Sequence, residues 1–433
     1  MMKKAASFAL GCKVNQYESE AIAELFAEKG YEIVGIDEEA DVYVINTCTV
    51  TNFGDKKSRQ LIRKVKRQNE NAIVAVVGCY AQTAPQELMR VEGVNLVIGT
   101  KDRAQIVEMV ENYDVSRGVE NHVTDIMKER MFEPLSIQKL ANRTRAYLKI
   151  QDGCSQYCSY CIIPYARGPI RSREPQEVLA EVRRLADNGF KEVVLTGIHV
   201  ASYGKDRRDT SLLEILRQVH EVEGIERIRF SSIEPNVVTE EFAQAMAELP
   251  KVCDHFHLSL QSGCDKTLKE MNRKYDTEKY RQAAATLRKY LPHVALTTDI
   301  IVGFPGETEE DFQASYDFAK EIGFAKIHVF PYSPKRGTPA AARKDQLPNA
   351  VKSERSHKLI ALSDKMAADF LGEYIGQDVE VLYERMVEDG IYEGHTTNYI
   401  KVRGRSEKDL TNQICKTRIT KTEGEELFGE ADA

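Results

Sequence analysis

Short apolar runs alternate with amphipathic stretches through the first quarter of the chain. The runs have the length of buried strands, and the stretches between them repeat apolar residues at the three- and four-residue spacing of a helix. The predicted strands are 5–10, 31–36, 42–46, 73–77 and 96–98, and the predicted helices begin at about 15 or cover 55–67, 86–90 and 103–111. Strands that alternate with helices indicate a mainly parallel sheet with right-handed crossovers.

After a stretch without clear periodicity, 115–141, which is interpreted as a linker, the alternation of strands and helices returns. Six strands are expected, at 147–150, 193–195, 227–230, 255–260, 294–301 and 327–330. One helix between them should have Pro175 near its first position and end at Gly189. Another should begin around Thr308, and a further helix is expected over 349–371. Six strands are fewer than the eight of a closed (β/α)8 barrel.

The periodicity changes to that of short strands in the last part of the chain. Strands are expected at 378–384, 391–396, 399–402 and 413–419, with turns at Asp389-Gly390 and Thr397-Asn398. Antiparallel strands of this size predict a small barrel of the OB type. The predicted fold class is therefore α/β with a small all-β tail, divided into domains 3–114, 140–371 and 372–433.

Composition indicates the class of protein and the compartment in which it is expected. The chain has 433 residues, of which 42% are hydrophobic and 29% charged, as expected of a globular protein of about two to four domains. No run approaches the roughly 18 apolar residues needed to span a bilayer, and the apolar part of the N-terminus is too short for an export signal. Nine cysteines is an odd number, which argues against a fully paired disulfide framework. We expect a cytoplasmic protein without a membrane partner.

Three cysteines form the motif C-x3-C-x2-C just after the first strand of the second set: Cys154, Cys158 and Cys161. A zinc site would need a fourth ligand nearby, and the next histidine is as far away as His199. Three thiolates can instead hold a [4Fe–4S] cluster and leave one iron open to an outside ligand. A zinc knuckle and chance spacing are the alternatives.

Three further cysteines each follow a predicted strand of the first set: Cys12, Cys48 and Cys79. Ligands collect outside the carboxyl ends of the strands of an open parallel sheet. The three thiols should therefore meet at one edge and hold a second cluster, again with an open iron. The alternative is that they are three small buried core residues.

Two segments are strongly basic although the chain as a whole carries a formal net charge of −7. Residues 55–67 contain seven basic residues and one acidic residue, and residues 401–421 contain seven basic and two acidic residues. Each segment is either a solvated face or a contact to RNA phosphates. Because the overall charge is negative, binding to nucleic acid would depend on such local patches.

The cysteine motif, with an aromatic residue (Tyr160) before its third cysteine, resembles that of the radical S-adenosylmethionine (SAM) enzymes. The resemblance implies a partial (β/α)6 barrel and an open iron that chelates the amino and carboxylate groups of SAM. It also implies cleavage of SAM to methionine and a 5′-deoxyadenosyl radical. The residues expected to line SAM are Tyr160, Thr196, Gly197, Ser231, Gln261 and Gly303; ordinary turn residues are the alternative for the strand-end positions among them. Glu234, Arg273 and Lys274 are further residues expected at the barrel mouth.

The sequence around the other cysteines resembles the N-terminal domain of the methylthiotransferases. The matching words are 11–19 (GCKVNQYES), 46–50 (NTCTV) and 78–82 (GCYAQ). The resemblance implies an auxiliary [4Fe–4S] cluster on Cys12, Cys48 and Cys79 that carries the sulfur to be inserted, and a second SAM that methylates it. It also implies an RNA-binding TRAM barrel in the tail, an electron donor such as flavodoxin or ferredoxin, and a sulfur donor that the sequence does not identify.

The form GCKVNQ resembles the bacterial branch that acts on threonylcarbamoyl-adenosine next to the anticodon, so the expected partner is the anticodon stem-loop of tRNA. Alternatives within the superfamily are methylthiolation of isopentenyl-adenosine in tRNA or of an aspartate of a ribosomal protein. An alternative of another class is an RNA-binding iron–sulfur scaffold or redox sensor without radical chemistry. The polar residues at the barrel strand ends favour the enzyme.

Overall fold

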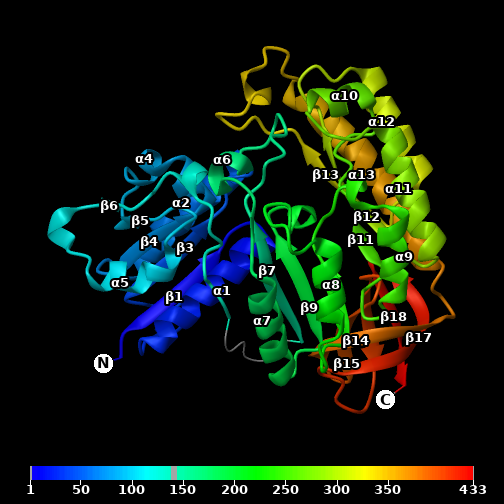
Figure 1. Ribbon diagram of the computed structural model, residues 1–433, viewed down its shortest axis with the longest axis horizontal. Helices are drawn as coiled ribbons and strands as arrows, with labels where there is room; N and C mark the ends of the chain where they lie inside the picture. Colours follow the sequence, from blue (N-terminus) through cyan, green and yellow to red (C-terminus); the bar gives the residue numbers. More distant parts are fainter. Residues whose placement is uncertain (1, 138–143, 433) are drawn as a thin grey trace.

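The computed structural model describes residues 2–137 and 144–432 (Figure 1). Its first unit is a six-stranded parallel sheet in the order β2-β1-β3-β4-β5-β6. The strands are β1 Lys4–Ala9, β2 Glu32–Ile33, β3 Val42–Thr47, β4 Ile73–Gly78, β5 Leu96–Val97 and β6 Glu120–Asn121, and the helices are α1 Lys13–Glu28, α2 Asn52–Gln68, α3 Cys79–Thr83, α4 Pro85–Leu88 and α5 Ile106–Glu111. The parallel sheet is as predicted.

Alternation along each strand divides the first unit into two apolar layers. Val42 and Val44 of β3 pack with residues of α1 and α5, whereas Tyr43 and Ile45 pack with α2 and α4 on the other face. Period-two patterning of this kind is what a strand buried on both faces requires.

The interpretation of 115–141 as a linker is wrong for the part that the structure describes. Glu120–Asn121 is a strand that pairs with β5, and Leu135 and Ile137 are buried in the core of the middle unit. A two-residue strand is too short to produce a periodic pattern, which is why it was not predicted. The predicted domain start at residue 140 lies outside the described residues.

The middle unit contains the six predicted parallel strands. The strands are β7 Arg145–Asp152, β9 Glu192–Gly197, β10 Arg227–Phe230, β11 His255–His257, β12 Ala295–Val302 and β13 Lys326–Pro331. A bridge between Ile233 and Leu258 joins the β10 and β11 edges, and the two-residue strand β8 (Arg171–Ser172) lies antiparallel on β7. The helices are α6 Ile163–Arg167, α7 Pro175–Asp187, α8 Leu212–His220, α9 Glu240–Glu248, α10 Asp265–Glu270, α11 Thr277–Tyr290, α12 Glu309–Ile322 and α13 Asn349–Gly372. The predicted partial (β/α)6 barrel is confirmed.

The tail is a closed barrel in the order β14-β15-β16-β18-β17. Its strands are β14 Asp378–Glu388, β15 Ile391–Thr396, β16 Lys401–Arg405, β17 Ile414–Glu423 and β18 Glu426–Asp432. The sequence predicted four strands, and the fifth, β18, closes the barrel by pairing with β16 and β17. Its acidic residues and Gly429 weaken the strand pattern, so tertiary pairing decides its conformation.

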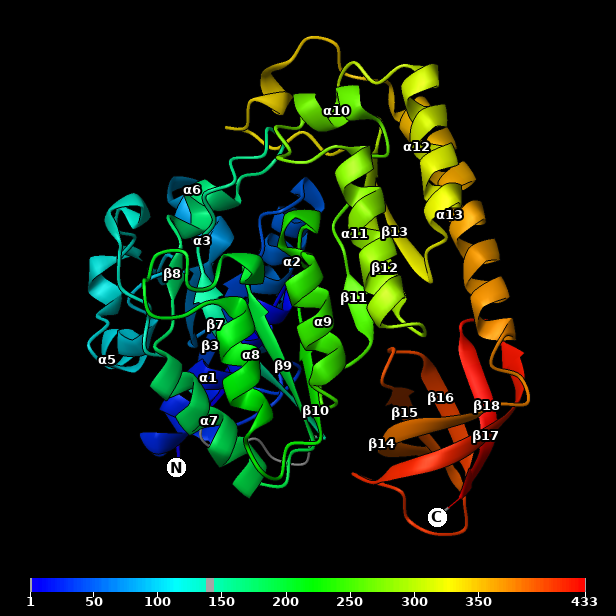
Figure 2. The same ribbon diagram turned by 45° about the vertical axis from the view of Figure 1, so that its right-hand side comes forward.

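The three units pack against one another around the strands of the partial barrel. In Figure 2 the tail barrel lies below β11 and β12, beyond the end of the long helix α13. Helix α6, which follows the C-x3-C-x2-C loop, lies beside α3 of the first unit. This packing brings α6 against the helix that begins at Cys79, directly after β4.

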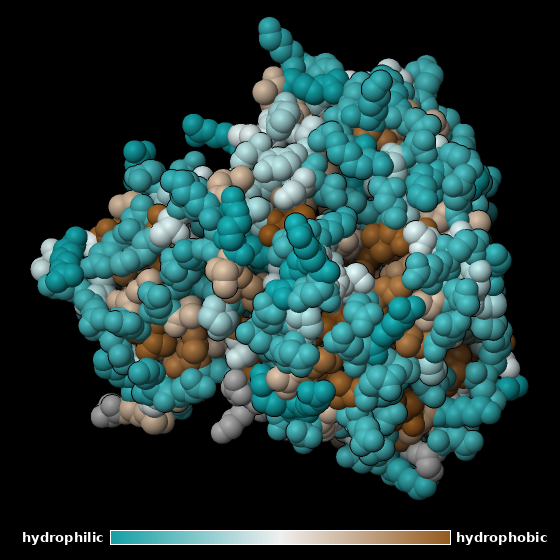
Figure 3. Space-filling model, in the orientation of Figure 1, coloured by the Kyte–Doolittle hydropathy of each residue, from teal (hydrophilic) through white to brown (hydrophobic). Residues whose placement is uncertain are grey.

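Most of the face drawn in Figure 3 is hydrophilic, and its hydrophobic residues lie mainly in recesses. Within the described ranges, no helix is both long enough and apolar enough to cross a membrane.

Candidate active site

The first cysteine trio, Cys154, Cys158 and Cys161, lies in a tightly closed loop after β7. The loop begins at Gly153, which has φ +73°, and a Cβ there would lie 1.8 Å from the carbonyl oxygen of Pro169. Only glycine permits this approach. The backbone N–H of Cys154 donates to the carbonyl oxygen of Gly168 over 3.0 Å, and the backbone N–H of Cys161 donates to the carbonyl oxygen of Cys158 over 2.9 Å. The loop therefore gathers its thiols at the carboxyl end of the first barrel strand.

The electrostatics of this trio suit a bound metal cluster. Burial, together with the neighbouring Cys158 thiol, raises the pKa of Cys154 to about 11 and that of Cys161 to about 12. Thiols that oppose one another's ionisation in a buried site become thiolates when a cation binds them. Arg273 Nη1 donates to Cys158 Sγ over 3.2 Å, and its Nη2 donates to Glu234 over 2.8 Å. The donor set fits a [4Fe–4S] cluster with three protein ligands.

The second trio lies at the ends of three neighbouring strands. Cys12 follows β1, Cys48 follows β3, and Cys79 follows β4 as the first residue of α3. Gly11 has φ +98°, and a Cβ there would lie 2.7 Å from Cys48 Sγ, so glycine lets the two loops touch. Burial, then the neighbouring Cys79 thiol, raises the pKa of Cys48 to about 12. The strand ends bring these thiols together as the topology predicted, and they suit the same kind of cluster.

A buried ionic network connects the two trios. Arg167 of α6 donates from Nε to Cys79 Sγ over 3.1 Å, and its Nη1 donates to Glu18 over 2.5 Å. Lys149 of β7 bridges Glu18 at 2.7 Å and Asp152 at 2.5 Å. Asp152 in turn accepts from the N–H of Gly153 at the start of the other cysteine loop. The sequence did not point to this network, because its members are far apart along the chain.

A cavity of about 1100 Å³ opens between the three units. Cys12 lines it from the first unit, Thr196, Gly197 and Ser231 line it from the barrel, and Tyr399 lines it from the tail. The hydroxyl oxygen of Thr196 is buried and has no hydrogen-bond partner within the described part of the chain, as expected of a group that a ligand would satisfy.

Three of the residues predicted to line SAM lie away from this cavity wall. Tyr160 packs on the small apolar cluster around Phe304, and burial raises its pKa well above the ordinary value. Gln261 has φ +69° and pairs through its backbone with β12. The N–H of Gly303 donates to Glu307 over 2.6 Å. All six SAM-lining assignments stay predictions.

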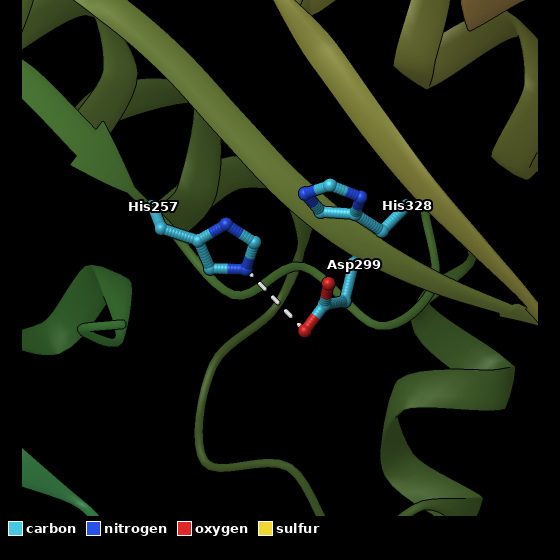
Figure 4. A group of neighbouring side chains, drawn as sticks. All are labelled: His257, Asp299 and His328. Carbon is cyan, nitrogen blue, oxygen red and sulfur yellow. Dashed lines mark ion pairs between the residues drawn. The ribbon is translucent and has the colours of Figure 1, made fainter. Parts of the chain in front are cut away.

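A polar cluster on the cavity wall was not predicted from the sequence. His257, Asp299 and His328 come from the adjacent strands β11, β12 and β13 and face one another (Figure 4). His257 Nε2 lies 3.3 Å from Asp299 Oδ2, and the two imidazole rings stack with centroids 5.8 Å apart. The sequence signal that could have identified this cluster is that its members occupy strand positions whose side chains point to the barrel interior.

The tail barrel contributes an aromatic residue to the cavity. Tyr399 lies in the β15–β16 turn with φ +69°, and its ring stacks on His395 at 4.9 Å. The guanidinium groups of Arg229 and Arg145 lie 4.6 and 5.2 Å from the ring. Both arginines also bind the buried carboxylate of Glu192, each over 3.0 Å.

Comparisons with known proteins agree with this arrangement. The family model described as "Radical SAM superfamily" matches residues 148–319, and the model described as "Uncharacterized protein family UPF0004" matches residues 4–99. A Bacillus subtilis protein named threonylcarbamoyladenosine tRNA methylthiotransferase is 47% identical over 97% of this chain and 94% of its own length. The chain belongs to the radical-SAM methylthiotransferase family.

A second named protein and one solved structure are also similar to this methylthiotransferase. An Acetivibrio thermocellus protein named tRNA-2-methylthio-N(6)-dimethylallyladenosine synthase is 36% identical over 94% of the chain and 87% of its own length. The solved structure of a radical SAM methyltransferase from Kitasatospora setae is 17% identical, covers 79% of this chain and 77% of its own, and has a TM-score of 0.57. The latter supports the fold alone.

The predicted class, a radical-SAM enzyme of the methylthiotransferase family, is thereby confirmed. Membership implies one [4Fe–4S] cluster and SAM as cofactors. The assignment of individual residues to these cofactors, and the presence of a second cluster, stay predictions.

Proposed function

We propose that this enzyme inserts sulfur and a methyl group at C2 of threonylcarbamoyl-adenosine, next to the anticodon in tRNA. The observation that carries the proposal is the cavity between the units, because Cys12 of one trio and the strand ends beside the other trio face the same space. The name and 47% identity of the Bacillus subtilis relative support this choice of nucleoside.

In this proposal Cys154, Cys158 and Cys161 hold the cluster that binds SAM, and Cys12, Cys48 and Cys79 hold an auxiliary cluster. With SAM bound, these groups supply the radical chemistry that activates an unreactive aromatic C–H bond, the sulfur, and the methyl group from a second SAM. The chain's own residues hold the two sites at a fixed separation through the network of Arg167, Glu18 and Lys149. Positioning within a closed cavity is the protein's main contribution to such chemistry.

The proposed roles follow the predicted domains 3–114, 140–371 and 372–433. The first would present the inserted sulfur, the second would bind SAM, and the tail would contact tRNA together with the basic helix α2. The anticodon stem-loop is the expected binding element, because single-stranded loop bases can be splayed out and recognised by stacking and edge contacts. An electron donor such as flavodoxin or ferredoxin would reduce the enzyme.

A second candidate is methylthiolation of dimethylallyl-adenosine, which the name of the Acetivibrio thermocellus relative favours. Mass spectrometry of tRNA nucleosides separates the two. Deleting the gene should remove 2-methylthio-threonylcarbamoyl-adenosine and leave other methylthiolated nucleosides unchanged. Wild-type chain should restore the product, and Cys158→Ala should not. Loss of the dimethylallyl product instead would establish the second candidate, and an unchanged nucleoside profile would refute both.

A further inference from the structure

Among the described residues, one cation on the cavity wall, Lys13, forms no ion pair with a carboxylate. Arg229 binds Glu192 at 3.0 Å, Lys326 pairs with Glu425, and Lys401 binds Glu426 at 2.8 Å. Lys13, which also lines the cavity, has no carboxylate oxygen within 4.0 Å in the part of the chain that the structure describes. Lys13 is exposed toward this cavity, and an ammonium group that is not already paired with a carboxylate can form a charge-assisted hydrogen bond with an anionic ligand.

Lys13 lies beside a second group with unused hydrogen-bonding capacity. Its Nζ is 5.7 Å from the ring centroid of Tyr147 and 5.9 Å from that of Tyr399. The ring of His255 is 5.1 Å from Tyr399 on the same cavity wall. His255 Nδ1 is buried and has no hydrogen-bond partner among residues 2–137 and 144–432, while its Nε2 lies 3.0 Å from the hydroxyl of Thr297. Lys13 and His255 therefore flank one aromatic ring, and each offers one polar atom to a ligand.

The two candidate nucleosides differ in the chemistry that such a corner would recognise. The threonylcarbamoyl group ends in a carboxylate and a hydroxyl, whereas the dimethylallyl group is uncharged and has no hydrogen-bonding atoms. Both groups are attached to the exocyclic nitrogen N6. This nitrogen is bonded to C6 of the six-membered ring that also contains the reacting C2. Lys13 directly follows Cys12, so a base with C2 near that cysteine would hold its N6 substituent in the neighbourhood of Lys13.

We propose that Lys13, assisted by His255, binds the carboxylate of the threonylcarbamoyl group and so determines the enzyme's specificity for that nucleoside. This inference rests on the proposed function, since it concerns the substrate of the same site. A bound analogue without the anion would cover the Lys13 ammonium group without pairing it, and the site therefore disfavours such an analogue.

The test uses anaerobically reconstituted full-length enzyme and synthetic anticodon stem-loops. Three RNAs differ only in the N6 group, which is threonylcarbamoyl, its neutral carboxamide, or dimethylallyl. Lys13→Met should lower kcat/KM for the threonylcarbamoyl RNA by roughly 10- to 100-fold, the loss expected for one hydrogen bond between charged groups. It should leave the carboxamide RNA nearly unchanged, and Lys13→Arg should recover most of the difference.

Lys326→Met is the matched control, because Lys326 lines the same cavity but is paired with Glu425 and Asp364. It should preserve the preference for the carboxylate. Iron content and SAM cleavage without RNA should be equal in all variants. If Lys13→Met loses iron because of its position beside Cys12, the wild-type enzyme still decides, because it should prefer the carboxylate RNA over the carboxamide RNA by a similar factor.

Equal activity of wild-type enzyme on the carboxylate and carboxamide RNAs would overturn the inference. So would an equal loss on both RNAs in Lys13→Met with normal iron content. Failure of wild-type enzyme to modify any of the three RNAs would instead refute the proposed function. A wild-type preference for the dimethylallyl RNA would refute the threonylcarbamoyl assignment and this inference together.

Discussion

Arg167 and Cys79 are joined by a hydrogen bond of 3.1 Å from the guanidinium Nε to the thiol sulfur, although the two residues belong to different units of the protein. Burial raises the pKa of the Cys79 thiol, and the arginine opposes that effect. The same guanidinium binds Glu18, whose pKa burial would raise but which Arg103, Arg167 and Lys149 hold well below its ordinary value. The Arg167 side chain thus donates a hydrogen bond to a proposed metal ligand and also stabilises a buried carboxylate between the two proposed cluster sites.

Replacing Arg167 should destabilise the protein strongly. Arg167→Met leaves Glu18 and Asp152 with less positive charge in a fully buried setting, and removing one partner of a buried ion pair costs on the order of 3–5 kcal/mol. The midpoint of chemical unfolding should fall accordingly, and Arg167→Lys should recover part of the loss. Arg336→Met is the control, because the Arg336 side chain is 96% exposed and should be replaceable without effect. Equal midpoints for the two Met variants would contradict the structural role given to the network.

The iron content should reveal two separate clusters. If each trio binds a [4Fe–4S] cluster, the reconstituted chain should hold about eight irons. Replacing Cys154, Cys158 and Cys161 by alanine should leave about four, and so should replacing Cys12, Cys48 and Cys79. Iron and acid-labile sulfide are measured together after removal of loosely bound metal. A second triple variant that keeps all its iron would eliminate the auxiliary cluster.

The two trios should differ in what their loss does to SAM. Cys158→Ala should abolish formation of 5′-deoxyadenosine, because SAM loses its anchoring iron. Cys48→Ala should abolish the methylthiolated nucleoside while some uncoupled cleavage of SAM remains. Chromatography of both products from the same reaction gives the comparison. If both variants lose SAM cleavage to the same extent, the clusters do not divide the work in this way.

Cysteine spacing and strand order were enough to predict where the six proposed ligands lie, because both depend on local pattern and on the general rule for parallel sheets. The residues that connect them were not predictable in this way. Arg167, Glu18 and Lys149 lie on three separate elements, and no periodicity links them. Strands β6 and β18 were missed for a related reason, since pairing with neighbours, and not their own composition, makes them strands. The cluster of His257, Asp299 and His328 could likewise be predicted only once the register of three adjacent strands was known.

Tyr399 should be important for holding the tail on the barrel. Tyr399→Asn tolerates the positive φ of this position but removes the ring that Arg229 and Arg145 cover, at an expected cost of about 1–3 kcal/mol. Tyr399→Phe keeps the ring and loses only the 3.1 Å hydrogen bond from Arg145, so its effect should be smaller. Limited proteolysis between α13 and β14, together with unfolding midpoints, measures the effect. Faster cleavage in the Phe variant than in the Asn variant would show that the hydroxyl, and not the ring, holds the interface.

The two basic segments differ in a way that the sequence did not reveal. In the tail, Lys416 and Arg418 both bind Asp378, at 3.0 and 3.2 Å. Lys401 and Arg403 are also paired with carboxylates, and so is Lys421. In α2, by contrast, Lys56, Lys57 and Arg63 are exposed, and no carboxylate oxygen lies within 4.0 Å of them among the described residues. The expected RNA contact therefore shifts from the tail strands toward α2.

Neutralising α2 should accordingly weaken binding of tRNA more than neutralising the tail. In a Lys56→Gln, Lys57→Gln and Arg63→Gln variant, affinity should fall for all tRNAs, and the salt dependence should become shallower by roughly 0.7 to 0.9 logarithmic units per lost phosphate contact. A Lys416→Gln and Arg418→Gln variant should change the slope little, because Asp378 already offsets those charges. Fluorescence anisotropy with unmodified anticodon stem-loop over a range of salt concentrations gives both slopes, and SAM cleavage without RNA should stay constant. A larger change in the tail variant would mean that its ion pairs open when RNA binds, and that the tail is the principal RNA-binding surface.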